Sequence, residues 1–462
     1  MQVLQTNLDA QAGLISARLD RLPATRTVWT RVILLSLGGF FEFYDLFFTG
    51  YIAPGLVRSH ILTTTGIAGF IAAMFSGLFV GTALFGFVAD RLGRRTIFTC
   101  SLLWYTVASV FMAFQNDVFG LDLCRFLAGI GVGVELVTID TYLAELVPKE
   151  WRGRAFAYNQ TIQFSAVPLV ALLAWLLVPR SPFGLDGWRW VVLIGAAGAI
   201  FVWWIRLRVP ESPRWLAQHG RIVEAEQVLA DLEKLVASES RAPLPAPGTP
   251  EARTSRGSFR EIWKPPYRSR TVMLIVFQLF QTVGFYGFSN WVPTLLIGRG
   301  IAITSSLRYT FLIAIAAPLG PLLASAIADK IERKWQIVLA AFGIAFFGVL
   351  FGQLNIVPLL ILLGVLVTLS ANILSFSSHA YQAELYPTRI RAMAVGFTYS
   401  WSRFSVIFSS FAIAFFLDRF GVPGVFAFIA GSMAIVMLSI GWFGPKTNNL
   451  SLESISPESI SG

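Results

Sequence analysis

Charged residues are scarce in this chain. Only 13% of its 462 residues are Asp, Glu, Lys or Arg, whereas soluble globular proteins carry about 25%. So few charges cannot coat a water-exposed surface of this size, and 55% of the residues are hydrophobic. The composition argues against a soluble enzyme, a disordered chain or a fibrous protein. It predicts a polytopic membrane protein.

Residues that bind metals and nucleotides are also scarce. Three scattered His and two Cys predict no metal or haem cluster, so we expect no cofactor and no membrane enzyme. The chain has no Gly-x-x-x-x-Gly-Lys-Ser/Thr phosphate loop, which disfavours a primary pump. Cys100 and Cys124 lie in or beside apolar runs and are interpreted as small hydrophobic side chains.

Long apolar runs are abundant. A helix needs about 20 residues to cross a hydrocarbon core of ~30 Å. Twelve runs meet this length and predict an all-α integral membrane protein. They are residues 32–54, 66–89, 96–115, 119–146, 153–178, 189–209, 271–297, 305–329, 335–352, 356–384, 391–417 and 422–443.

The positive charges predict the orientation. With both termini cytoplasmic, 28 of the 36 Lys and Arg, including all six Lys, fall in cytoplasmic segments and six fall outside. The net charge of +10 is therefore a topology signal, and we expect no binding to nucleic acid.

The polar segments divide the chain into five parts. A cytoplasmic tail at 1–31 precedes a six-helix bundle at 32–209. A cytoplasmic linker follows at 210–270, in which 221–236 has the spacing of a short amphipathic helix. A second six-helix bundle at 271–443 precedes a cytoplasmic tail at 444–462.

The two bundles are predicted to be repeats. Residues 89–95 (ADRLGRR) correspond to 328–334 (ADKIERK), and the residues Ala-Glu-Leu of 144–146 correspond to those of 383–385. Both correspondences have an offset of 239 residues. A repeated bundle with a ligand site between pseudo-symmetric halves is the architecture of many secondary transporters.

Three motifs carry a family resemblance: 86–95 (GFVADRLGRR), 210–214 (PESPR) and Glu145…Pro148…Arg152-Gly153. With them the chain resembles the major facilitator superfamily, in its sugar-porter and organic-ion branch, which includes the synaptic-vesicle-2 proteins. Residues 285–287, 291–293 and 381–392, with Arg403, are similar to bacterial niacin permeases. The resemblance implies a monomeric, multi-pass transporter of the bacterial inner membrane.

A buried ion pair is predicted between Asp45 and Arg125. Asp45 lies ~20 Å from the cytoplasmic start of its span, and Arg125 lies ~9 Å below the outer surface, so both occupy the outer half at similar depth. Protonation of the Asp would release the Arg and link protonation to conformation. Phe43-Tyr44-Asp45 and Arg125 also resemble the proton site of proton-coupled sugar porters. A static ion pair is the alternative.

Three further acids lie in the spans. Glu42 is about 60° from Asp45 around the helix, and either shares the proton or helps to select substrate. Glu135 lies nearer the cytoplasm and is a candidate for an inner gate or for the proton site itself. For Asp140 a structural hydrogen-bonding role is favoured.

Arg403 is the main clue to the substrate. It lies ~18 Å into its span, near the midplane where such transporters bind their ligand. No carboxylate lies within one turn of it, so a substrate carboxylate is its expected partner. The alternative is a pair with another helix, through Glu135 or Asp140.

Other residues at similar depth are candidates for the lining of a site. The aromatic candidates are Phe285, Tyr286, Trp291 and Trp401, on which a flat acid could stack. The polar candidates are Gln160, Gln163, Gln278, Gln281 and Asn290. For His379 a structural hydrogen bond is favoured over a proton relay.

The resemblance implies that charges at the cytoplasmic loops hold the halves together when the transporter faces outward. These gating candidates are Asp90, Arg91, Arg94, Arg95, Glu145, Arg152, Asp329, Glu384 and Arg391.

The sequence thus predicts a secondary active transporter for proton-coupled uptake of nicotinate by alternating access. The alternatives are a transporter of another aromatic or small carboxylate or of a sugar, and, from a different class, a non-transporting receptor. The expected partners are the organic anion, protons and the lipid bilayer.

Overall fold

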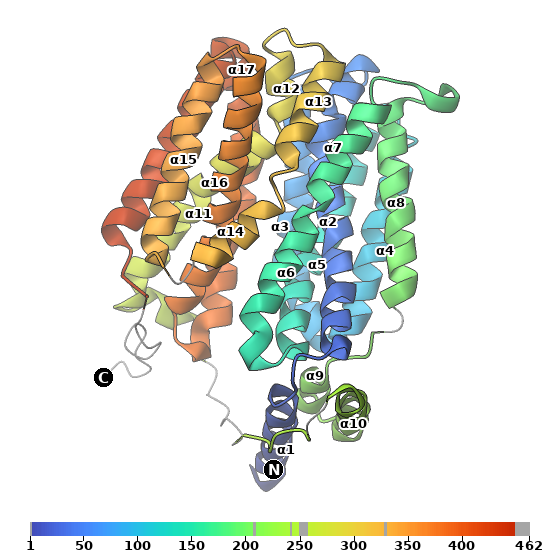
Figure 1. Cartoon of the computed structure of the whole chain (residues 1–462), viewed down its shortest axis with the longest axis vertical. Helices are drawn as coiled ribbons and strands as arrows, with labels where there is room; N and C mark the ends of the chain where they lie inside the picture. Colours follow the sequence, from blue (N-terminus) through green and yellow to red (C-terminus); the bar gives the residue numbers. More distant parts are fainter. Residues whose placement is uncertain (1, 207–208, 241–242, 249–256, 328–329, 449–462) are drawn as a thin grey trace.

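The computed structural model describes residues 2–206, 209–240, 243–248, 257–327 and 330–448. These residues form helices and connecting turns without a β-strand. Two bundles stand side by side, and α1, α9 and α10 form a smaller cluster below one of them (Figure 1). We call the end of the bundle that carries this cluster the linker end and the opposite end the far end.

The first bundle contains six of the predicted spans. Its helices are α2 (Arg26–Arg58), α3 (Gly66–Leu92), α4 (Arg94–Met112), α5 (Val118–Leu146), α6 (Arg152–Phe164) with α7 (Ala166–Leu177), and α8 (Gly187–Arg206). The fifth span is divided into α6 and α7 at Ser165, because Pro168 in the next turn has no N–H to donate to the carbonyl of Phe164.

The second bundle contains the other six spans. Its helices are α11 (Tyr267–Ser289) with α12 (Val292–Ile297), α13 (Ile303–Ala314) with α14 (Leu319–Ile327), α15 (Arg333–Gln353), α16 (Val357–Glu384) and α17 (Thr388–Phe443). Short 3-10 helices lie at Lys149–Trp151, Pro182–Gly184 and Phe259–Trp263.

Helix α17 contains the last two predicted spans. Its backbone leaves the helical conformation at Gly421, where φ is +64°, a conformation that favours glycine. Ten helical segments of the described residues, α17 counted once, are long and apolar enough to cross a membrane.

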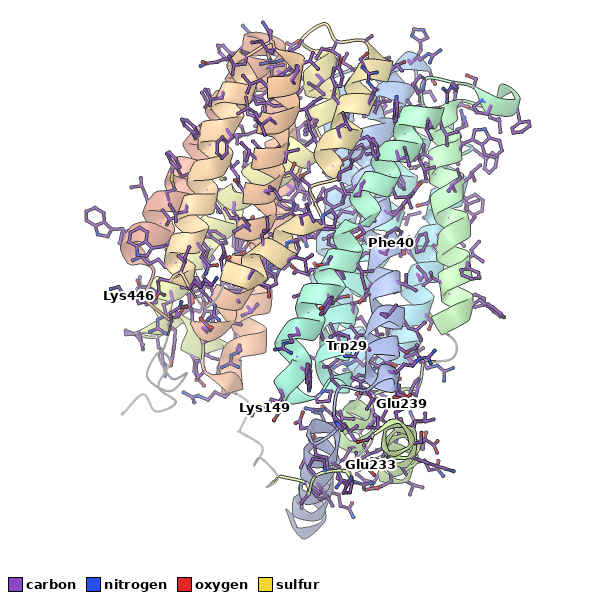
Figure 2. The ribbon with its side chains drawn as sticks, viewed as in Figure 1. Trp29, Phe40, Lys149, Glu233, Glu239 and Lys446 are labelled. Carbon is purple, nitrogen blue, oxygen red and sulfur yellow. The ribbon has the colours of Figure 1, made fainter. Side chains whose placement is uncertain are left out.

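The linker end carries a small apolar core of its own. Helix α1 (Gln2–Asp20) packs against α9 (Pro213–Gln218) and α10 (Ile222–Glu239) through side chains that include Ile15, Leu19 and Leu229. Helix α10 matches the predicted amphipathic helix, whereas α1 lies in the predicted tail and was not expected as a helix. Figure 2 shows Glu233 of α10 beneath the bundle.

The two bundles meet closely towards the far end. A Cβ atom on Gly50 of α2 would lie 2.1 Å from the carbonyl oxygen of Asn290, at the break between α11 and α12. Trp175 of α7 stacks on Phe311 of α13, with ring centroids 5.8 Å apart. Glycine at position 50 therefore permits a direct backbone contact between the halves.

Candidate functional site

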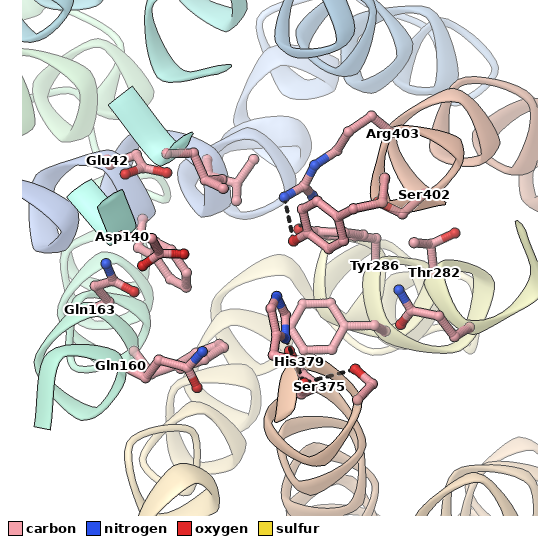
Figure 3. A pocket seen from close by; sticks show the side chains of 18 residues that line it. Glu42, Asp140, Gln160, Gln163, Thr282, Tyr286, Ser375, His379, Ser402 and Arg403 are labelled. Atoms are coloured by element: carbon pink, nitrogen blue, oxygen red, sulfur yellow. Dashed lines mark hydrogen bonds between the residues drawn. The ribbon is translucent and has the colours of Figure 1, made fainter. Parts of the chain in front are cut away.

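A cavity lies between the halves on the linker side of these contacts. Helices α2, α5 and α6 line it from the first half, and α11, α16 and α17 from the second (Figure 3). The empty space around these side chains, with open solvent at the mouth included, is about 730 Å³. Its lining residues are Glu42, Phe43, Leu46, Leu136, Asp140, Gln160, Gln163, Phe164, Gln281, Thr282, Phe285, Tyr286, Ser375, Ser378, His379, Tyr399, Ser402 and Arg403.

Arg403 lies in the wall of this cavity and is 2% exposed. Its Nη1 donates to the hydroxyl of Tyr286 at 2.6 Å and its Nη2 to that of Tyr399 at 2.8 Å. Both partners are neutral hydroxyls, and within the described residues no carboxylate forms an ion pair with this guanidinium. The alternative of a pair with Glu135 or Asp140 is therefore not the arrangement found.

Tyr399 was missed in the sequence analysis, although a signal was present. It lies four residues before Arg403, on the same face of α17, and the guanidinium carbon is 4.8 Å from its ring centroid. The two tyrosines hold the guanidinium in one orientation, because each accepts one of its N–H groups.

Asp45 and Arg125 form the predicted ion pair. The Nη1 atom of Arg125 is 2.9 Å from Oδ2 of Asp45, and both side chains are buried. Ser109 donates to the other carboxylate oxygen at 2.6 Å. The Nη2 atom of Arg125 donates to the backbone oxygen of Asp45 and to the hydroxyl of Thr49. The pair is outside the lining of the cavity, in the interior of the first half.

Glu42 and Asp140 lie on the cavity wall of the first half (Figure 3). Glu42 is the more buried of the two, at 0% exposed. Asp140 is exposed, lines the cavity, and makes no hydrogen bond or ion pair with a described residue. The structural hydrogen-bonding role favoured for Asp140 is therefore wrong for this structure. Glu135 is fully buried in α5 and is absent from the described lining.

The structure brings five of the nine predicted lining residues to the cavity. Gln163, Gln281, Phe285 and Tyr286 line it, and so does Gln160.

The other four predicted lining residues lie elsewhere. Trp401 is two residues from Arg403, about 200° around α17, and packs instead against Phe397 and Phe404. Asn290 and Trp291 lie a turn beyond Tyr286 towards the far end, at the break between α11 and α12. These three candidates are not in the described lining, because helix rotation or axial position directs them elsewhere. The fourth, Gln278, donates to Gln382 of α16 at 3.0 Å and is also outside the described lining.

His379 lies on α16 at the cavity wall. Its Nδ1 is 2.6 Å from the backbone oxygen of Ser375, so Nδ1 carries the proton in this bond. Its ring is 5.3 Å from that of Tyr399. The favoured structural hydrogen bond is present, and the ring also faces the cavity.

Aromatic side chains separate this cavity from a second one towards the far end. Phe164 and Phe285 line both, and their rings are 6.2 Å apart. Phe47 packs against both of them and against Tyr286. The second cavity is the smaller of the two and is lined mostly by apolar side chains. These rings and the contact at Gly50 block the path from the first cavity to the far end.

Several gating candidates pair within their own half. Arg94 lies 3.3 Å from Glu145, and Arg333 pairs with Glu384. Arg391 donates to the backbone oxygen of Tyr386 at 3.2 Å.

The remaining gating candidates have varied surroundings. The backbone N–H groups of Arg94 and Arg95 donate to Glu211 at 3.0 and 3.1 Å, a partner that the sequence analysis did not assign. Arg152 lies 3.8 Å from Asp20 of α1, and Arg91 is exposed. The side chain of Asp90 and the whole of Asp329 lie outside the described residues.

Comparisons with known proteins identify the family. The family described as "Sugar (and other) transporter" matches residues 32–458. The chain is 34% identical over 434 residues to the putative metabolite transport protein YyaJ of Bacillus subtilis, covering 93% of this chain and 95% of that one. It is 27% identical over 445 residues to the niacin transporter NiaP of Acinetobacter baylyi, covering 95% and 99%.

A solved structure confirms the predicted fold. The xylose transporter XylE of Escherichia coli, in a partially occluded inward-open conformation, has a TM-score of 0.74 at 19% identity, covering 92% of this chain and 99% of XylE. It is described as a major facilitator superfamily proton:xylose symporter. The chain therefore belongs to the sugar (and other) transporter family and is a multi-pass secondary transporter of the major facilitator fold, not an enzyme.

Proposed function

We propose that the protein takes up a small aromatic carboxylate, with nicotinate as the first candidate, together with protons across a bacterial inner membrane. The linker end is then cytoplasmic, as the distribution of Lys and Arg predicts. The observation that carries the proposal is the environment of Arg403 in the cavity wall. Its guanidinium donates to two tyrosine hydroxyls and forms no ion pair with a described carboxylate.

A carboxylate substrate satisfies this guanidinium. Burying an unpaired charge is costly, and a guanidinium and a carboxylate form short, charge-assisted hydrogen bonds. Because Tyr286 and Tyr399 accept from Arg403, each hydroxyl still has its own proton to donate. Arg403 and both tyrosines can thus donate to one carboxylate, while Phe285 offers a ring for an aromatic substrate to pack against.

A sugar is the second candidate. It is supported by the amides of Gln160, Gln163 and Gln281 in the cavity wall and by the overall similarity to the xylose transporter XylE. The similarity to NiaP supports nicotinate instead. A neutral sugar does not compensate the charge of Arg403, which is why the carboxylate is preferred.

Asp45 is the proposed proton carrier. In the buried pair, the negative charge of Asp45 compensates Arg125. A proton on the carboxylate removes this compensation, so Arg125 must find other acceptors, and the packing of α2 against α5 changes with it. Glu42 and Glu135 remain candidates for sharing this role.

The test is binding and uptake by the purified protein in proteoliposomes. The ligands are nicotinate, nicotinamide, benzoate, a hexose and an organic cation. We expect saturable uptake of nicotinate driven by an inward proton gradient, and none of nicotinamide, which keeps the ring and lacks the charge. Arg403→Ala should abolish uptake, with Arg419→Ala, an exposed residue of the same helix outside the described lining, as control. Uptake of nicotinate that survives Arg403→Ala would refute the anion assignment.

A further inference from the structure

The two walls of the cavity carry opposite charge. The wall from the first half presents the carboxylates of Glu42 and Asp140, and the wall from the second half presents the guanidinium of Arg403 (Figure 3). Asp140 is the most accessible of these charged residues, since it is exposed whereas Glu42 and Arg403 are buried, and it makes no hydrogen bond or ion pair with a described residue.

The wall from the first half, which we call the acidic wall because it carries Glu42 and Asp140, does not favour the binding of a simple anion. A carboxylate on Arg403 would face Glu42 and Asp140 across the same cavity, and like charges in a site of low dielectric repel strongly. An aromatic acid without a second polar group is attracted by Arg403 on one wall and repelled by Glu42 and Asp140 on the other, so the repulsion reduces its binding free energy.

A hydrogen-bond acceptor supplements the acidic wall. The side-chain oxygen of Gln160 is buried and has no hydrogen-bond partner in the described part of the chain. It lies on α6 in the lining of the same cavity. A buried acceptor without a donor costs free energy unless a ligand supplies the donor. The wall from the first half thus offers two carboxylates and the oxygen of Gln160 as acceptors for a cationic or N–H group of a ligand.

We infer that the substrate is a zwitterion of small organic size. Its carboxylate binds to Arg403 and Tyr286, and its cationic nitrogen lies against Asp140, Glu42 and Gln160. This inference rests on the proposed carboxylate function. It adds to that function a cationic group at the other end of the substrate. A ligand that joins both walls also explains how binding can draw the two halves together, because each pole belongs to one half.

The experiment compares four ligands that share one ring shape. Benzoate has only the carboxylate, and nicotinate has a carboxylate and a neutral ring nitrogen. N-methylnicotinate has a carboxylate and a permanently cationic nitrogen, and N-methylnicotinamide has only the cationic nitrogen. Binding of each to the full-length protein in lipid nanodiscs is measured by calorimetry. We expect N-methylnicotinate to bind at least about tenfold more tightly than benzoate, a difference of ~1.4 kcal/mol.

Two variants test whether Asp140 binds the cationic nitrogen of the ligand. Asp140→Asn should reduce the ratio of the affinities for N-methylnicotinate and benzoate to about twofold or less. The affinity for benzoate should not fall. Asp122→Asn is the matched control, because Asp122 lies on the same helix and is absent from the described lining; it should keep the full preference. If Asp140→Asn does not fold, Glu42→Gln provides the same comparison.

The outcomes separate this inference from the proposed function. Equal binding of benzoate and N-methylnicotinate by the unmodified protein would overturn the zwitterion and leave the carboxylate function intact. A preference that survives both Asp140→Asn and Glu42→Gln would overturn the assignment to these residues. Binding of N-methylnicotinamide alone, with no carboxylate bound, would overturn the proposed function itself.

Discussion

Asp45 of α2 and Arg125 of α5 form a buried ion pair in which the carboxylate also accepts a hydrogen bond from Ser109 of α4. One charge pair therefore ties three helices of the first half together, while Glu42, one turn before Asp45 on α2, lines the cavity. Protonation of Asp45 is therefore expected to affect the packing of α2, the helix that contributes Glu42 to the cavity wall.

Asp45→Asn should uncouple transport from the proton gradient. The amide keeps the shape of the carboxylate and cannot gain or lose a proton in the transport cycle. We expect accumulation driven by a pH gradient to disappear, while substrate affinity changes by no more than about threefold. Uptake and exchange in proteoliposomes, with and without the gradient, measure the two effects separately. Undiminished gradient-driven accumulation would rule out Asp45 as the proton carrier.

Arg125→Met should destabilise the protein more than the double variant Asp45→Leu, Arg125→Met. The single change leaves a carboxylate buried without its guanidinium, at a cost of about 3–5 kcal/mol, whereas two apolar side chains of similar volume are often neutral. Thermal unfolding in one detergent compares the two variants, and gradient-driven uptake should be absent from both. If the double variant is the less stable of the two, the ion pair has a stabilising role beyond charge compensation.

Gly50→Ala should open the far end. The new Cβ would lie 2.1 Å from the backbone oxygen of Asn290, so the halves must separate there. A cysteine introduced by Thr310→Cys in the second cavity, with Cys100 and Cys124 replaced by Ser, reports on access from the far end. We expect labelling by a membrane-impermeant thiol reagent to rise about tenfold, the change that ~1.4 kcal/mol produces.

The matched control for this substitution is Gly153→Ala. A Cβ at Gly153 would have no atom within 4 Å, so labelling should not change. Labelling that rises equally in both variants would show that the effect is not specific to the contact between Gly50 and Asn290.

Acid should release α1 from the linker helices. Burial raises the pKa of Glu233, but its hydrogen bonds to Arg18 and Arg21 outweigh burial and hold the pKa below the ordinary value of 4.5. The ionised carboxylate therefore stabilises the docked state at neutral pH, and this contribution is lost as the pH falls through the lowered pKa. The protection factors of the amides of α1, which correct for the slower intrinsic exchange in acid, should fall as the pH is lowered from about 5 to about 3.

Two variants check the role of Glu233. Glu233→Gln should accelerate exchange in α1 already at neutral pH and weaken its dependence on acid. Glu224→Gln should leave exchange unchanged, because Glu224 is exposed and, among the described residues, forms its ion pair with Arg221 of the adjacent turn and not with α1. The assignment fails if both variants behave like the unmodified protein.

Much of the architecture was predictable because membrane spans are determined locally. A run of about 20 apolar residues forms a helix whatever its neighbours are. The pairing of Asp45 with Arg125 was also predictable, because depth in the membrane follows from position along the helix. Helix α1 was missed because its stability depends on partners about 200 residues away, such as Glu233, which binds Arg18.

The sequence by itself determined the spans, the repeat and the depth of each charge, since these depend on distance along one chain. Only the tertiary structure decided which way each side chain faces. It directed Tyr399 rather than Trp401 to Arg403 and exposed Asp140 to the cavity. The reason is physical: rotation of a helix about its axis is determined by packing against its neighbours, and an offset of two residues turns a side chain by about 200°.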